Sequence, residues 1–474
     1  MTRRSPFNLG RAVRLALVAS ILLVASPVGL GAAAPVEPLG TAQPTVGIRI
    51  PVTPAGKQLA WLLHHINAGA GDLSVGDLRA HVAPTYLAYA PAPQLLETIR
   101  GYVVPSAPLA VARFEGGLTE TRANAVLTAP SGPDWRIHLG VEAAEPHRID
   151  TLFFEQVVLP TPVATPPKDW AALDDQLERL APGVSFVAAE VTGGGCRPIH
   201  AYRAAESLGI ASSFKLYVLG ELTRQLAAGE ITWDELLAID PSLVSLPSGD
   251  LRLQPPGTLL PVRTFAEQMI SASDNTATDH LISRLGRERV EAAFAAMGQA
   301  DPGRNQPLLL TREWFAIKMR YGRGQVRQYL RADTQERRRI LTEEVDPTAD
   351  TLSELEPWPG IYYIDQIEWF ASAGDLCRAL SYLQQAGTAG GMTPALDALS
   401  LNPGFAFDAR DWAYVGYKAG FESGVNSVNW LLQRQDGRWF AVSGIVNDEE
   451  RLPNADGLFQ LAGATVVPWL AEQP

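Results

Sequence analysis

The segment over residues 159–168, LPTPVATPPK, divides this chain of 474 residues into two parts. Proline fixes one backbone torsion and has no backbone N–H, so closely spaced prolines oppose both a helix and an inner strand. A chain of this length also exceeds the usual size of one compact core. We therefore predict two folded parts, residues 55–158 and 169–474, joined by a Pro-rich linker over residues 159–168.

The first 54 residues are expected to lie outside both folded parts. An apolar stretch over residues 15–24 and small residues at 31–34 follow a basic start, which is typical of a signal peptide over residues 1–34. A membrane anchor is the alternative, but Pro27 interrupts the apolar stretch before the roughly 20 residues that a span needs. Residues 35–54 are rich in Pro, Gly, Ala and Thr and predict a flexible tether. We therefore expect an exported protein with no stable membrane span after cleavage.

Composition narrows the class of protein. The chain has 39 Lys and Arg against 51 Asp and Glu, a formal charge of −12, which argues against nucleic acid as a partner because phosphate binding needs a basic face. A hydrophobic content of 46% is enough for a sizeable core. No P-loop, G-x-S-x-G or H-E-x-x-H motif occurs.

The only two cysteines are Cys196 and Cys377. In an oxidising compartment they could form one disulfide, and the alternative is two buried free thiols. His200 is the only histidine near either cysteine, so we predict no metal site and no cofactor.

The first part has helical apolar spacing followed by alternating patterns. Three helices are predicted at 58–67, 78–87 and 93–102, with Pro84 able to cut the second short. Four strands are predicted at 109–114, 121–127, 135–141 and 147–158, each bounded by Gly, Pro or Ser signals. Helices followed by an antiparallel sheet predict a small α+β domain.

The second part begins and ends with strands around a helical middle. Its predicted elements are a helix at 170–179, a hairpin of strands 184–191 and 198–203, and an apolar helix at 212–228. The C-terminal stretch adds strands at 413–418, 427–433 and 439–446 and a last helix at 457–472. We therefore predict a large domain that mixes helices and strands.

The first chemical motif is Ser212-Ser213-Phe214-Lys215, which places a hydroxyl at a helix start and an amine one turn later on the same face. Serine is a poor nucleophile at its own pKa, and an adjacent amine kept neutral by burial can serve as its base. The alternative is that Ser212 caps the helix and Lys215 is an ordinary surface lysine.

Two further motifs follow in the chain. Ser273-Asp274-Asn275 stands at the end of a helical stretch, where the Ser273 hydroxyl can relay a proton and Asn275 can hold a substrate amide or a lysine. Lys418-Ala419-Gly420-Phe421 places a cation beside a small residue and a glycine on a strand. A substrate could pair its backbone along such an edge, and an ordinary strand with a bulge glycine is the alternative.

In this order the three motifs resemble the S-x-x-K, S-D-N and K-T-G set of class A serine β-lactamases and penicillin-binding proteins. The two-part layout and the segments at 196–200 and 307–313 look like the β-lactamase-like serine hydrolases of actinobacteria and related bacteria. That group includes the two-domain protein of the clavulanic-acid biosynthetic cluster, whose smaller N-terminal domain is NTF2-like or steroid-isomerase-like. The resemblance implies a three-layer αβα domain with a central antiparallel sheet and a helical subdomain, preceded by a small NTF2-like α+β domain.

The resemblance also implies a role for each motif residue. Ser212 would be the acylated nucleophile and Lys215 its base, while Ser273, helped by Lys418, would pass the proton to the leaving group. The backbone N–H groups of Ser212 and Phe421 would form an oxyanion hole, with Gly420 and Asn275 in the substrate-binding site. Donors of this kind typically contribute about 3 to 4 kcal/mol in the transition state.

The chain departs from this pattern in two places. Ala419 stands where the third motif usually has Thr or Ser, which removes a hydroxyl that would hold a substrate carboxylate. No E-x-x-L-N loop, the source of the water-orienting glutamate in class A enzymes, lies between Asn275 and Lys418. Glu313 is in roughly the right region but its context favours a helix start. We therefore expect an acyl-enzyme that forms readily and hydrolyses slowly.

Residues 320–360 are charged and poorly patterned, and could be an insertion that covers the mouth of the active site. Five aromatic residues around it could form a cleft wall, but their spacing favours a place in the core: Trp358, Tyr362, Tyr363, Trp369 and Phe370.

Three functions remain open from the sequence. The first is an exported serine hydrolase that takes a β-lactam, an ester or a peptide-like substrate. The second is a D,D-peptidase or penicillin-binding protein that acts on peptidoglycan peptides. The third is a protein that binds acyl ligands with little turnover.

Overall fold

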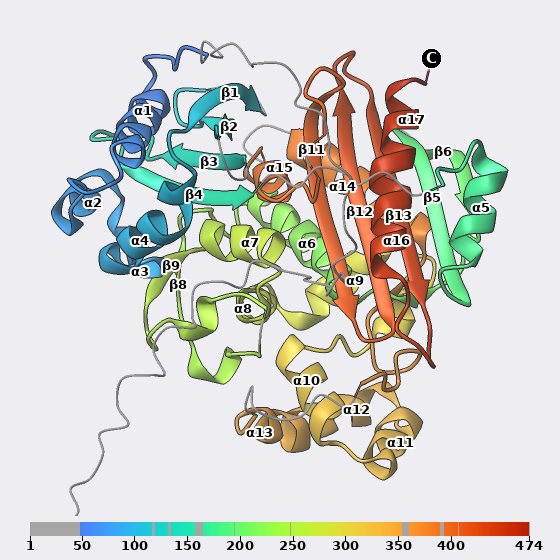
Figure 1. Cartoon of the computed structure of the whole chain (residues 1–474). Helices are drawn as coiled ribbons and strands as arrows, with labels where there is room; N and C mark the ends of the chain where they lie inside the picture. Colours follow the sequence, from blue (N-terminus) through green and yellow to red (C-terminus); the bar gives the residue numbers. More distant parts are fainter. Residues whose placement is uncertain are drawn as a thin grey trace, which may run out of the picture.

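The computed structural model describes residues 48–115, 119–130, 134–156, 165–193, 195–246, 248–352, 360–388, 393–405 and 407–473. The predicted signal peptide, most of the tether and residues 159–164 of the linker lie outside these residues. Within them, no helix combines the length and the apolar character needed to cross a membrane. The described residues build two parts, each with its own sheet and its own hydrophobic core (Figure 1).

The N-terminal part packs helices on one face of a four-stranded antiparallel sheet. Its helices are α1 (Pro54–Asn67), α2 (Val75–His81), α3 (Pro84–Tyr89) and α4 (Ala92–Thr98). Its strands run in the order β1 (Ala110–Glu115), β2 (Asn124–Thr128), β3 (Trp135–Val141) and β4 (Ile149–Gln156). The predicted helix at 78–87 is two helices, because Pro84 starts α3 and cannot donate the hydrogen bond that would continue α2.

Strand β3 shows how this sheet divides its side chains between two faces. Ile137 and Leu139 belong to the core beneath the helices. Arg136 and His138 alternate with them and therefore point to the opposite face, where they are nevertheless buried. That second face lies against the C-terminal part (Figure 1).

The C-terminal part is built on a five-stranded antiparallel sheet in the order β11-β12-β13-β5-β6. The strands span Gly183–Thr192 (β5), Gly195–Tyr202 (β6), Trp412–Glu422 (β11), Val425–Arg434 (β12) and Trp439–Asn447 (β13). Strands from the two ends of this part thus meet in one sheet, and β11 forms one of its edges.

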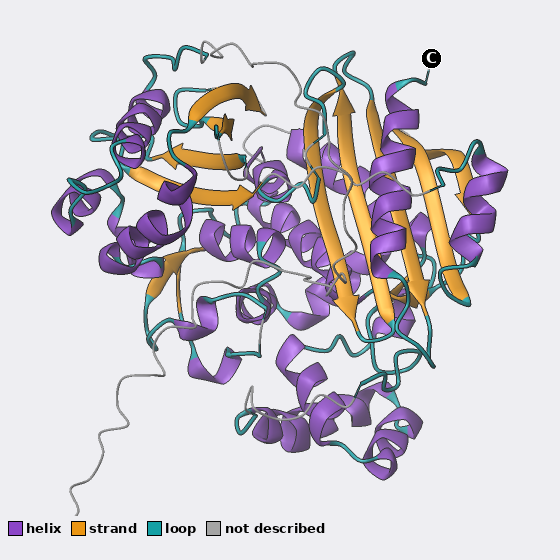
Figure 2. Ribbon diagram, in the orientation of Figure 1, coloured by secondary structure: helices purple, strands orange, loops and turns teal. Residues whose placement is uncertain are grey.

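Helices cover both faces of this sheet (Figure 2). The helices α5 (Trp170–Glu178), α16 (Ala455–Gln460) and α17 (Val467–Ala471) share a core with Phe186 and Trp430. On the other face α6 (Lys215–Ala227) and α14 (Ala373–Thr388) share a core with Val187 and Leu431, the neighbours of those residues along the strands. The predicted three-layer domain with a central antiparallel sheet is confirmed.

A helical subdomain extends from the second of these faces. It comprises α7 (Val262–Ser271), α8 (Asn275–Leu285), α9 (Arg287–Ala296), α10 (Thr311–Arg320), α11 (Arg323–Arg331), α12 (Thr334–Ile340), α13 (Asp346–Ala349) and α15 (Thr393–Ser400). Two short two-stranded antiparallel sheets accompany it, β7 (Leu208–Gly209) with β10 (Phe370–Ala371) and β8 (Leu236–Ala238) with β9 (Leu259–Pro261).

The charged region at 320–360 is largely helical where the structure describes it, although its sequence is poorly patterned. These helices place a few apolar residues in the core, among them Val326, Ile340 and Leu341. Arginines and glutamates that form ion pairs, such as Arg339 with Glu336, separate these residues in the sequence, so the apolar pattern is hard to recognise. Whether the region covers the active-site mouth stays a prediction.

Cys196 on β6 and Cys377 on α14 form a disulfide, with their Cα atoms 6.3 Å apart. The alternative of two free thiols is therefore wrong. Of the aromatic residues discussed above, Trp369 and Phe370 are buried and Tyr362 and Tyr363 are half-buried against the core, as their spacing predicted. Trp358 lies outside the described residues.

Candidate active site

Ser212 lies in a 3-10 turn, Ala211–Phe214, directly before helix α6. The backbone N–H of Ile210 donates to the Trp369 carbonyl at 2.9 Å, which fixes the chain two residues before Ser212. Ala211 then adopts a φ of +44°, a conformation that residues with a side chain rarely take. This turn leaves the Ser212 side chain half-buried, while its neighbours Ala211 and Ser213 are buried.

The inner side of the turn is attached to strand β12. The Ser427 hydroxyl donates to the Ile210 carbonyl at 2.8 Å and lies 2.5 Å from the Ser213 hydroxyl. The side-chain amide of Asn429 donates to Ser213 at 2.9 Å and to the Lys418 carbonyl at 3.0 Å. These bonds hold the turn of Ser212 and the strand of Lys418 in one frame.

Lys215 is the first residue of α6 and is fully buried, so the alternative of a surface lysine is wrong. The N-cap of this helix is Phe214, with no side-chain capping bond, so the structure does not support a capping role for Ser212 either. The Lys215 amine donates to Asn275 Oδ1 at 2.7 Å, to the Ser273 carbonyl at 2.5 Å and to the Ser273 hydroxyl at 3.2 Å. The first two motifs therefore meet.

The second motif is a strained turn between α7 and α8. Ser273 has a φ of +55°. The Ser248 hydroxyl donates to its carbonyl at 2.6 Å. Asp274 caps α8 by accepting from the Ala277 backbone at 2.7 Å, and it also accepts from the Leu251 backbone at 2.9 Å. These contacts fix the direction in which the Ser273 hydroxyl and the Asn275 amide project.

The third motif lies on the edge strand β11. The Lys418 amine donates to the Ser273 hydroxyl at 2.9 Å and to the Ala419 carbonyl at 2.6 Å. Gly420 passes so close to the turn that a Cβ on it would lie 2.0 Å from the Ile210 carbonyl oxygen and 2.8 Å from the Ser212 nitrogen. Only glycine permits this approach, which brings the backbone of Phe421 next to that of Ser212.

Burial controls the charge of both amines. It lowers the pKa of Lys215 to about 7, although Asp274 and Asp279 act in the opposite direction. The pKa of Lys418 is well below its ordinary value because the amine is buried, and because Lys215 is nearby. An amine whose pKa lies near 7, as that of Lys215 does, can accept and release a proton near neutral pH.

Glu313 does not share these contacts. It is the third residue of α10, where one carboxylate oxygen accepts from the Leu310 backbone at 2.8 Å and the other forms an ion pair with Arg287 at 2.7 Å. The side chain is fully buried. The structure therefore gives Glu313 the helix-start role that its sequence context favoured. Residues 297–310, between α9 and α10, are all described and contain one acidic residue, Asp301.

Two family models match this chain. Residues 173–343 match the model of the beta-lactamase enzyme family, a range that spans the Ser212 turn, the second motif and most of the helical subdomain. Residues 50–145 match the model described as the N-terminal part of the ORF 12 gene product. The chain contains a β-lactamase-like domain. The search of curated proteins gave no match.

The solved structures that are similar to this chain share little of its sequence. The structure of PBP-A is 15% identical, with 67% of this chain and 100% of that chain covered and a TM-score of 0.42. A β-lactamase from Sphaerobacter thermophilus is 17% identical, with 65% and 100% covered and a TM-score of 0.44. A β-lactamase from Chitinophaga pinensis is 15% identical, with 64% and 98% covered and a TM-score of 0.44.

Sequence motifs did not reveal the residues that position this β-lactamase-like site. Ser248, Ser427 and Asn429 hold the motif residues through hydrogen bonds but stand in no recognisable pattern. Ser427 and Asn429 stand out only as buried polar residues inside the sheet, and burial cannot be known before strand pairing is known, while Ser248 lies in a loop and is half-buried.

A buried cluster of charged residues, which includes Glu422 two residues after Gly420, was not predicted from the sequence either. Lys318 donates to Glu422 at 3.1 Å and to the Tyr362 carbonyl at 2.5 Å. The Glu368 carboxyl completes the cluster. Its pKa is raised well above the ordinary value by burial and by the nearby Glu422 carboxyl. Glu422 shares a face of β11 with Lys418 and Gly420, so this cluster borders the site.

Within the described ranges, no group of three or more His, Cys, Asp or Glu side chains could hold a metal ion. His200 instead bonds Asp174 at 2.6 Å and stacks on Trp170.

Proposed function

We propose that this protein is a serine hydrolase in which Ser212 is acylated by an ester or a β-lactam. The observation that carries the proposal is the convergence of Lys215, Ser273 and Lys418. These residues come from three separate elements and are linked by hydrogen bonds next to the Ser212 turn. A helix cap and a strand lysine of purely structural origin would not need this arrangement.

Proton transfer follows from these contacts. Neutral Lys215 takes the proton of Ser212 as the hydroxyl attacks the carbonyl carbon of the substrate. The proton then reaches the leaving group through Ser273, whose hydroxyl is bonded by both amines. The backbone N–H groups of Ser212 and Phe421, brought together by Gly420, stabilise the oxyanion.

The substrate is expected to depend little on a free carboxylate. Ala419 supplies no hydroxyl for one, and burial lowers the pKa of Lys418, which weakens this amine as an anion site. The Phe421 side chain is 65% exposed beside the nucleophile turn and offers an apolar contact instead. These features favour esters with an apolar acyl or alcohol group over carboxylate-bearing donors.

Deacylation is expected to be slow. In this proposal the step needs a base to orient water, and Glu313 is occupied by Arg287 and the Leu310 backbone. The 297–310 segment offers only Asp301, which is exposed. The acyl-enzyme should therefore accumulate.

Intact-protein mass spectrometry tests the proposal. The purified protein and its Ser212→Ala variant are incubated with a p-nitrophenyl ester, a penicillin and a cephalosporin, and adduct mass is followed over time. We expect a persistent acyl adduct on the wild type with the ester first, and none on Ser212→Ala. Absence of an adduct with all three, together with no substrate loss, would contradict the proposal.

A further inference from the structure

The proposed oxyanion hole is made by two pieces of backbone that are far apart in the chain, the Ser212 turn and the end of strand β11. Among the described strands, only β12 pairs with β11. At Phe421 and Glu422 this pairing is about to end, because Glu422 is the last paired residue before the hairpin turn. The position of the Phe421 N–H therefore needs support from outside the sheet.

A buried side chain next to Phe421 supplies such support. Glu422 is 6% exposed and accepts a hydrogen bond from the Lys318 amine of α10 at 3.1 Å. The same amine donates to the Tyr362 carbonyl at 2.5 Å. The end of β11 is thus attached both to α10 and to the segment over residues 360–369.

The Ser212 turn is attached to the same segment. The Ile210 N–H donates to the Trp369 carbonyl at 2.9 Å, and the Trp369 ring stacks on Phe214 with the ring centroids 4.0 Å apart. These two contacts hold the chain on both sides of Ser212. The segment over residues 360–369 therefore contacts both halves of the oxyanion hole.

Glu368 joins these two sets of contacts. One of its carboxyl oxygens accepts from the Trp369 N–H at 2.9 Å, and the carboxyl also forms a side-chain hydrogen bond with Glu422. Gly209 leaves room for this side chain, because a Cβ there would lie 2.8 Å from the Glu368 Cγ. Glu368 thus connects Trp369, which anchors the turn, to Glu422, which anchors the strand.

A hydrogen bond between two carboxyl groups needs one proton. Glu368 and Glu422 each have a buried oxygen, Oε2, that no donor among the described residues reaches. Two ionised carboxylates in contact would repel each other, and burial raises the pKa of both groups. One proton between them satisfies both oxygens, and Lys318 then balances the remaining negative charge.

We propose that Glu368 and Glu422 share one proton and act as positioning residues for the oxyanion hole. The inference rests on the function proposed above, because the hole matters only if Ser212 is acylated. The bridge fixes the distance between the Ser212 and Phe421 N–H groups, which must both reach the oxyanion. The two carboxyls act through the backbone and take no part in the proton transfer.

Stopped-flow acylation by a p-nitrophenyl ester and by its thionoester analogue tests the proposal. Sulfur is a weaker hydrogen-bond acceptor than oxygen, so an intact oxyanion hole favours the ester. Glu368→Leu removes the bridge and leaves the ion pair of Lys318 with Glu422 in place. We expect ester acylation to slow by about 10- to 100-fold, since a 1 Å displacement of an aligned group can cost about 100-fold. The thionoester should slow much less, so the ester-to-thionoester rate ratio should fall.

Three variants separate positioning from a general loss of structure. Glu368→Gln should recover most of the ester rate, because an amide can donate to Glu422 and accept from the Trp369 N–H. Ser273→Ala should slow both substrates alike and keep the rate ratio. Glu97→Leu, the same change at an exposed position of the N-terminal part, should alter neither rate. Thermal melting confirms folding, and Glu368→Asp, which is one methylene too short for the bridge, carries the test if Glu368→Leu does not fold.

Two results on folded protein would overturn the positioning role alone. One is an unchanged ester-to-thionoester rate ratio in Glu368→Leu. The other is a Glu368→Gln protein that is as slow as Glu368→Leu, which would contradict the shared proton. A wild-type protein that neither substrate acylates would instead overturn the function proposed above, and this role with it.

Discussion

The Lys418 amine lies 2.9 Å from the Ser273 hydroxyl, although the two residues are 145 positions apart. Lys215 reaches the same hydroxyl from the other side at 3.2 Å. A serine that accepts from two amines in a buried site has a fixed oxygen position, which suits a proton relay better than a single flexible contact would.

This relay predicts strongly coupled variants. Ser273→Ala and Lys418→Met should each lower the acylation rate of Ser212 by about 100-fold, the lower range for loss of a positioned proton donor. The double variant should be little worse than either one, because both remove the same relay. Stopped-flow measurement of the acylation rate with a chromogenic ester, on the wild type, both single variants and the double variant, gives the double-mutant cycle. Effects that multiply would contradict a shared relay.

The pH dependence of acylation should follow Lys215. The amine must be neutral to act as a base, and burial lowers its pKa to about 7. The acylation rate should therefore fall as the pH drops below about 7 and level off above it. Lys215→Arg keeps the charge at every pH and should be inactive throughout, while Lys57→Arg, an exposed change, should keep the wild-type profile. A profile without this step would contradict the role of Lys215.

Glu313 should matter for stability and not for deacylation. Glu313→Gln weakens the ion pair with Arg287 and should lower the free energy of unfolding by about 1.5 to 3 kcal/mol. The hydrolysis rate of the acyl-enzyme should stay within about twofold of wild type. Glu288→Gln, on a side chain that is 71% exposed, should change neither quantity. Urea unfolding and the decay of the adduct mass provide both measurements.

Glu368 should make stability fall as the pH rises. Its folded pKa is raised, so the native state keeps a proton that the unfolded chain releases above the ordinary glutamate value. Stability is therefore lost progressively from about pH 4.5 upward to the raised pKa. The groups that face it are Glu422, Lys318 and the Trp369 N–H.

The variant Glu368→Gln isolates this effect, since an amide resembles the protonated carboxyl. The free energy of unfolding of Glu368→Gln, minus that of the wild type, should be larger at pH 8 than at pH 5. Urea unfolding at the two pH values measures this difference. Glu449→Gln, at an exposed position, should show no such difference. If the stability of Glu368→Gln falls with pH as steeply as that of the wild type, another group causes the pH dependence.

The sequence predicted the motif residues because their spacing is local. Ser212 and Lys215 lie one helical turn apart, and a helix period places them on one face before any tertiary contact is known. The C-terminal strands were likewise predicted from the sequence, at 413–418, 427–433 and 439–446. Ser427 and Asn429 were not, because their role depends on pairing strand β12 with a turn more than 200 residues earlier in the chain.

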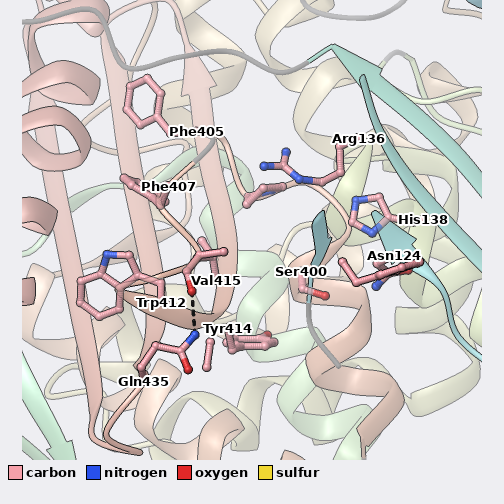
Figure 3. A pocket seen from close by; sticks show the side chains of 14 residues that line it. Asn124, Arg136, His138, Ser400, Phe405, Phe407, Trp412, Tyr414, Val415 and Gln435 are labelled. Atoms are coloured by element: carbon pink, nitrogen blue, oxygen red, sulfur yellow. Dashed lines mark hydrogen bonds between the residues drawn. The ribbon is translucent and has the colours of Figure 1, made fainter. Parts of the chain in front are cut away.

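The outer face of strand β3 shows the same limit from another side. Alternation on β3 placed Arg136 and His138 opposite the core, which normally means exposure to solvent. They are buried because a second part of the chain covers that face, as Figure 3 shows. Sequence patterns report which side chains share a face, and they do not report what lies against it.

The disulfide should contribute to stability without affecting acylation. Cys196 and Cys377 close a loop with a sequence separation of 181, for which loop entropy predicts a stabilisation of about 3 to 5 kcal/mol. The bond attaches β6, the edge of the sheet opposite β11, so the motif residues on β11 should keep their positions. Cys196→Ala/Cys377→Ala should unfold at lower urea and acylate at the wild-type rate. A reductant should shift the urea midpoint of the wild type toward that of the variant and leave the midpoint of the variant unchanged. A loss of acylation in the folded variant would instead show that the α14 side of the sheet positions the site.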